Sequence, residues 1–119
     1  MRQPFVHEAE LAMPPEADAR APGAAITVAL CGCWDHVPPC PLAPHHSHAE
    51  RVGGKFQVRT LFTVEPDKER RMRPLIDRAL RRGELNGPNG VTTRWQLRRS
   101  YCAEVTAEET AHAERLLKV

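Results

Sequence analysis

Apolar and polar residues alternate along three stretches of the chain. From Ile26 to Trp34, the apolar side chains of Ile26, Val28, Leu30 and Trp34 fall on one side by a period of two, with polar or small side chains on the other. The same period of two runs through Lys55 to Val64 and through Thr92 to Val105. Because successive side chains of a strand point to opposite faces, the alternation predicts three β-strands, each with one apolar side.

Two other stretches have the apolar spacing of helices. Residues 67–82 carry an apolar stripe formed by Met72, Leu75, Ile76, Ala79 and Leu80, and Gly83 follows as a natural helix end. Pro74 removes a backbone donor, so we expect a kink there or a regular part that begins near Arg73. Thr106 and Glu109 have the spacing of a capping box, which predicts that a second helix begins at Thr106.

The rest of the chain is rich in proline. Residues 1–24 hold four prolines and predict a flexible N-terminal arm, in which Phe5 to Met13 could form one or two helical turns. Residues 36–54 predict a long loop rich in Cys, His and Pro that ends at Gly53-Gly54. The expected order is strand, long loop, strand, helix, strand, helix.

This order predicts one α+β domain over residues 25–119. We expect a three-stranded antiparallel sheet, in which the first two strands form a wide hairpin and two helices cover one face. The opposite face would be open to solvent or to a second copy of the chain, so we expect a homo-oligomer that associates through this face.

Charge is unevenly distributed over the 119 residues. The formal net charge is only +2, but residues 51–99 hold 13 Lys or Arg and 5 Asp or Glu. The first twenty residues carry acids and prolines, so we expect no secretion signal, and no apolar run is long enough to span a bilayer. These features predict a cytoplasmic protein with reduced thiols.

Candidate metal ligands are concentrated in one segment. Residues 31–48 contain three of the four cysteines and four of the six histidines. Thiolate and imidazole are ligands that zinc prefers. The segment predicts a zinc site, structural or ligand-binding, whose candidate ligands are Cys40, His45, His48, His36 and His46. Adjacent His45 and His46 point apart in an extended backbone, so one of them would bind together with His48 or His36. The competing interpretation is a solvated loop in which Cys40 is an apolar filler.

The remaining cysteines leave several alternatives open. Cys31, Cys33 and Cys102 would share one sheet face, where they could bind a soft ion, form one cross-strand disulfide or pack against another chain. A thiolate nucleophile would require Cys40 or Cys33 to meet His36 in space. The sequence contains no phosphate-cradling glycine loop and no serine nucleophile motif, so no catalytic constellation is identified.

The alternative function is a nucleic-acid or protein-binding module without metal. It would use a basic sheet face with Arg59, Arg94 and Arg98, supported by arginines of the helix over residues 67–82. The aromatic side chains fall on the opposite side of the predicted sheet, which departs from a base-stacking platform. The helix arginines alternate with Asp67, Glu69 and Asp77, so they could also be a solvated surface.

Overall fold

The computed structural model describes residues 1–31, 44–87 and 90–117. The elements in chain order are β1 (Gln3–Ala12), α1 (Ala21–Cys31), β2 (His45–Val52), β3 (Lys55–Val64), α2 (Glu69–Arg82), β4 (Glu84–Asn86), β5 (Thr92–Arg94), β6 (Gln96–Ala103) and α3 (Thr110–Leu117). Single 3₁₀ turns at Pro66–Lys68 and Ala107–Glu109 precede α2 and α3.

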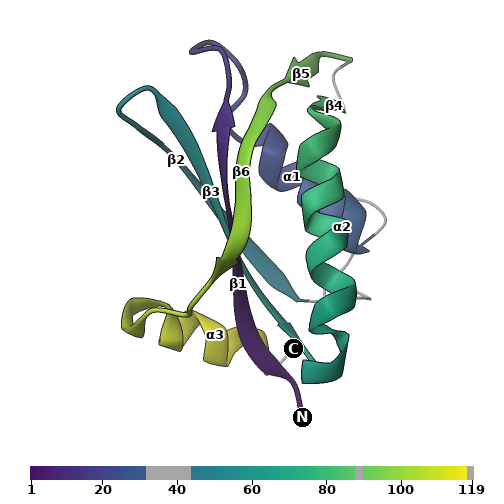
Figure 1. The fold of residues 1–119 in the computed structure, drawn as a ribbon, viewed down its shortest axis with the longest axis vertical. Helices are drawn as coiled ribbons and strands as arrows, with labels where there is room; N and C mark the ends of the chain where they lie inside the picture. Colours follow the sequence, from purple (N-terminus) through teal and green to yellow (C-terminus); the bar gives the residue numbers. More distant parts are fainter. Residues whose placement is uncertain (32–43, 88–89, 118–119) are drawn as a thin grey trace.

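A four-stranded antiparallel sheet, in the order β2-β3-β1-β6, forms the centre of the fold. Helices α1 and α2 lie together on one face, and the short α3 lies on the other (Figure 1). Strands β4 and β5 pair in a separate small sheet. The predicted α+β class with an antiparallel sheet covered by helices is confirmed. The expected three strands are four, and the second predicted helix is α3, which lies on the face that was expected to be open. The βαββαβ connectivity of the main elements is the split βαβ arrangement of ferredoxin-like domains, which carries no function by itself.

The prediction of a flexible arm over residues 1–24 is wrong for Gln3–Ala12. This segment is β1, an inner strand that pairs with both β3 and β6. Val6 and Leu11 are almost fully buried, and they lie on opposite faces of the sheet because they are five residues apart in one strand. The register shift beside Glu10 places its extra residue in β6, so the alternation along β1 is kept. The apolar spacing of Phe5 to Met13 also fits a helix, and this ambiguity, together with Pro4, obscured the strand.

The predicted strand from Ile26 to Trp34 is wrong as well. Residues Ala21–Cys31 form α1, which packs against the sheet and against α2. Ile26 and Leu30 have no exposed surface. The helix was predicted as a strand for two reasons: it is apolar on all sides and so has no amphipathic stripe, and its β-branched Ile26, Thr27 and Val28 are typical of strands. The rest of the predicted strand lies outside the described residues.

The end of the predicted loop is a strand. His45–Val52 forms β2, an edge strand that joins β3 through a tight hairpin. Gly53 and Gly54 both have positive φ (55° and 86°), as a two-residue hairpin turn requires. The expected wide hairpin between the first two predicted strands is therefore wrong. The second predicted strand, Lys55–Val64, is confirmed as β3 with the same bounds.

The predicted helix over residues 67–82 is confirmed. The chain enters it through the 3₁₀ turn at Pro66, and α2 then runs from Glu69 to Arg82 with Pro74 inside it. Met72, Ile76 and Leu80 are buried against the sheet and α1. Gly83 ends the helix in the left-handed conformation, with φ of 74°.

Trp95 links the end of α2 to the strands that follow. Its backbone N–H donates to the carbonyl of Gly83 at 2.9 Å, and its indole N–H donates to the carbonyl of Leu80 at 2.8 Å. The predicted strand over residues 92–105 is therefore divided into β5 and β6, because Trp95 bonds to the helix end and lies between the two sheets. We call this set of contacts the Gly83–Trp95 junction.

The last helical segment is capped at Thr106, as the sequence predicted, but it begins with the 3₁₀ turn Ala107–Glu109, and α3 itself starts at Thr110. Thr106 and Glu109 form both bonds of the capping box. Ala113 then packs against Val6 and Leu61 on the second face of the sheet. Within residues 1–31, 44–87 and 90–117, no helix is long and apolar enough to cross a membrane.

Two glycines with positive φ provide a test of the junction. A Cβ at Gly83 would lie 2.7 Å from the Trp95 carbonyl oxygen, whereas a Cβ at Gly54 meets no atom within 4 Å. Gly54→Ala should lower the unfolding free energy by about 1 kcal/mol through backbone strain alone. Gly83→Ala should lower it by roughly 2 to 4 kcal/mol, because overpacking is added. Urea denaturation measures both, and equal losses would contradict the steric role of the junction.

Candidate functional site

The three predicted histidine ligands of β2 do not point the same way. The Nε2 atom of His45 lies 2.9 Å from the hydroxyl of Thr27, on the side of α1. His46 lies on the other side, where it contacts α3, and His48 shares that side by the strand period of two. The pairing of His45 with His48 therefore does not occur. His36 and Cys40 lie outside the described residues.

His46 meets a histidine that the sequence did not suggest. Its ring centroid lies 4.5 Å from that of His112 on α3. Burial lowers the pKa of His46, and the charges of His112, His48 and His45 lower it further, so the imidazole stays neutral near pH 7. His48 instead lies 3.6 Å from a carboxylate oxygen of Glu50. Within the described part of the chain, no three His, Cys, Asp or Glu side chains are placed to hold a metal ion.

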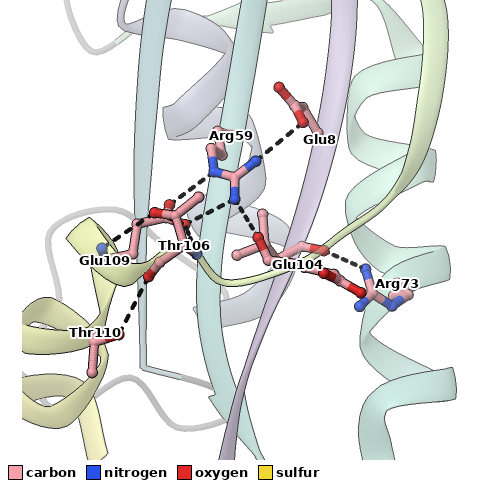
Figure 2. Close-up of polar contacts among 8 residues, drawn as sticks. Glu8, Arg59, Arg73, Glu104, Thr106, Glu109 and Thr110 are labelled. Carbon is pink, nitrogen blue, oxygen red and sulfur yellow. Dashed lines mark hydrogen bonds and ion pairs between the residues drawn. The ribbon is translucent and has the colours of Figure 1, made fainter.

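The guanidinium group of Arg59 is used in ion pairs within the fold. Its Nε and Nη2 atoms donate to the two carboxylate oxygens of Glu109, both at 2.8 Å, and Nη1 donates to Glu8 at 3.1 Å (Figure 2). Nη2 also donates to the carbonyl of Glu104. The hydrogen bonds from Arg59 lower the pKa of Glu109 to about 2. Arg59 therefore fixes the start of α3 to the sheet, and the predicted basic face does not include it as a free cation.

The exposed side of α2 is almost entirely arginine. Its exposed residues fall within a sector of about 120° around a helix of 3.6 residues per turn. They are Arg70, Arg71, Pro74, Arg78, Arg81 and Arg82. Arg81 pairs with Asp77 at 3.2 Å. The other four arginines make no ion pair with a described residue. Arg73 differs, because it faces inward and bonds to Glu69 and to the carbonyl of Val6.

A groove of about 710 Å³ lies where α2 meets the Gly83–Trp95 junction. Two arginines of the helix end, Arg81 and Arg82, line it together with Arg94 and Arg98 from the strands. Among the described residues that line it, the one acid is Glu84, which lies 3.3 Å from the Nε atom of Arg94. Arg82 and Arg98 are exposed and make no ion pair among the described residues. We call the exposed arginines of α2 with Arg94 and Arg98 the arginine surface.

The predicted basic residues are thus only partly together. Arg94 and Arg98 line one groove, and Arg59 lies on the sheet face that carries α3. The sequence did not predict that Arg81 and Arg82 line this groove. They share it with Arg94 because the hydrogen bonds of Trp95 hold the end of α2 against the strands. The exposed arginine stripe was the available signal, since five arginines share one face of the predicted helix.

A buried polar chain crosses from α2 to the sheet edge. His7 is 6% exposed, and its Nε2 atom lies 2.7 Å from the hydroxyl of Ser100. Its Nδ1 atom lies 3.3 Å from Nη1 of Arg73. Because a guanidinium can only donate, Nδ1 accepts and Nε2 carries the proton.

The direction of this chain excludes a serine-protease-like role in the observed arrangement. His7 donates to Ser100, and Ser100 bonds in turn to Asp77, so His7 cannot take the serine proton. The chain Arg73–His7–Ser100–Asp77 instead satisfies polar groups between α2 and β6 and fixes the orientation of the helix that carries the arginine surface.

Comparison of the chain with protein-family models, curated proteins and solved structures finds no match.

His7 should make the stability of the fold depend on pH. Burial lowers the pKa of His7 below its ordinary value of 6.5, and Arg73 lowers it further. The unfolded chain then binds a proton at higher pH than the folded chain, so stability falls as the pH drops below about 6.5. His7→Gln should lose less stability than wild type between about pH 7.5 and 5, measured by urea denaturation, whereas exposed His48→Gln should behave like wild type. An unchanged pH dependence in His7→Gln would contradict the assignment.

Proposed function

We propose that this chain binds nucleic acid through the arginine surface. The observation that carries the proposal is the groove lined by Arg81, Arg82, Arg94 and Arg98, in which the described part of the chain places a single acid. Guanidinium groups bind phosphate by paired, charge-assisted hydrogen bonds. The uncompensated charge of Arg82 and Arg98 gives the groove an unused capacity for anions.

The length of the surface favours a polymer over a small anion. From Arg70 to Arg82 the exposed arginines extend over about 18 Å of helix, at a rise of 1.5 Å per residue. The groove lies at the end of this row and adds Arg94 and Arg98. A single phosphate would use two or three of these groups, whereas a nucleic-acid strand presents phosphates along the whole row.

The charge of this region supports the same conclusion. Residues 70–99 contain nine arginines and two carboxylates, while the whole chain has a net charge of +2. The acids are concentrated elsewhere, and some of them hold Arg59. Such segregation of charge steers polyanions toward one face. An acidic protein is the rival partner, and the measurement below includes it as an outcome.

Removing the two unpaired groove arginines should weaken binding in a salt-dependent way. Arg82→Ser/Arg98→Ser should bind a labelled 20-nucleotide single strand at least tenfold more weakly at low salt, measured by fluorescence anisotropy. The slope of log K against log[salt] should become smaller by roughly 1.5 to 2, since about one counterion is released per phosphate contact.

Arg115→Ser is the matched control for this experiment, because Arg115 is an exposed arginine on α3, on the other face of the sheet. It should keep the wild-type affinity and slope. An equal loss in both variants would assign binding to net charge and contradict the proposed surface. Absence of binding to any nucleic acid at low salt, with binding to acidic proteins, would replace the proposal with the rival partner.

We also propose zinc binding as a second function, favoured by the contact between His46 and His112. Two imidazoles from distant parts of the chain lie together, and the lowered pKa of His46 keeps it in the neutral form that binds metal. Further donors would come from Cys40 and His36, which lie outside the described residues. The site would stabilise the start of β2 against α3.

Elemental analysis tests the zinc proposal independently of nucleic-acid binding. Protein purified without a histidine tag should contain close to one equivalent of zinc per chain. Cys40→Ser/His46→Gln should lose it, and His112→Gln should bind it about 10- to 100-fold more weakly if this imidazole is a ligand or orients one. His7→Gln should retain the metal. Wild-type protein that contains no zinc, and takes up none when it is added, would overturn the proposal.

A further inference from the structure

A second hollow adjoins the arginine groove. It has a volume of about 750 Å³ and lies between residues 14–24 and the β4–β5 hairpin. Its walls include the apolar side chains of Ala17, Ala21, Ala24 and Leu85. The volume is in the range of small-molecule sites and exceeds that of one nucleobase.

The two hollows share walls but differ in charge. Pro14 and Arg94 line both of them. The groove holds four arginines and one acid, whereas the hollow holds two arginines, Arg20 and Arg94, and two acids, Glu16 and Asp18. Arg20 bonds to Asp18 at 3.1 Å, so this pair is internally neutralised. The groove therefore suits an anion, and the hollow suits an uncharged group with an apolar face.

The arginine surface itself offers little to a nucleobase. Trp95 is the aromatic residue that lines the groove, but it is only 5% exposed and its indole N–H is used by Leu80. Base stacking on a basic surface requires an exposed aromatic face. A base attached to a phosphate in the groove finds its nearest apolar walls in the adjoining hollow.

We propose that the hollow receives an unpaired nucleobase whose phosphate is bound in the groove at Arg94. This inference rests on the proposed nucleic-acid binding and adds a preference for single strands or overhangs over closed duplex. The carboxylate of Glu16 and the hydroxyl oxygen of Thr92, whose own O–H donates to Asn86 at 2.7 Å, provide acceptors for the edge of the base. The large volume predicts tolerance of all four bases.

A pair of oligonucleotides with equal phosphate charge separates the two claims. Wild type should bind a 20-nucleotide thymidine strand at least fivefold more tightly than a 20-nucleotide strand of abasic residues, measured by fluorescence anisotropy. Ala17→Trp fills the hollow and should lose this preference while it keeps the affinity for the abasic strand. Ala24→Met, a second filling variant on α1, should act in the same direction, which protects the test against misfolding of one variant.

Ala19→Trp is the matched control, because Ala19 is exposed and does not line this hollow. It should keep the preference for the thymidine strand. Equal affinity of wild type for both strands would overturn the base site and leave phosphate binding intact. A preference that persists in both filling variants would also overturn it. Failure of wild type to bind either strand would instead overturn the proposed function.

Discussion

The hydrogen bonds of Trp95 to the end of α2 are the contacts on which the rest of the account depends. Trp95 donates to the carbonyls of Gly83 and Leu80 at the end of α2, where the Leu80 carbonyl also accepts from the backbone N–H of Gly83. Its ring is buried in the core, so the strands that follow cannot separate from the helix without exposing it. Arg81 and Arg82 thereby share a groove with Arg94 and Arg98, which follow in the chain after a further turn and hairpin.

Arginine has two different structural roles on this fold. On the face that carries α3, Arg59 pairs with Glu8 and Glu109 and holds the start of α3 against the sheet. On the α2 side, arginines outnumber acids and most of them have no described counter-ion, although like charges on one surface repel one another. A surface of this kind costs stability, and a bound polyanion would offset that cost. The contrast is the physical basis for assigning function to one surface and structure to the other.

The elements that the sequence predicted correctly are those that depend on residues close together in the chain. Strand β3, helix α2 and the capping box at Thr106 follow from period and capping chemistry, and the α+β class follows from their order. Helix α1 was missed because it is apolar on all sides, and β1 because Phe5 to Met13 fits two periods. The groove could not be predicted, since Arg82 and Arg98 line the same groove only because the hydrogen bonds of Trp95 hold the helix end against the strands. The contact of His46 with His112 likewise depends on where α3 packs.

Nuclear magnetic resonance of the arginine side chains during an oligonucleotide titration tests the central claim most directly. The Nε–H signals of Arg82, Arg94 and Arg98 should shift together as a single strand is added at low salt, and the shifts should disappear as salt is raised. The signals of Arg59 and Arg115 should stay in place. Shifts confined to Arg59, Arg115 or other residues outside the arginine surface would contradict the account.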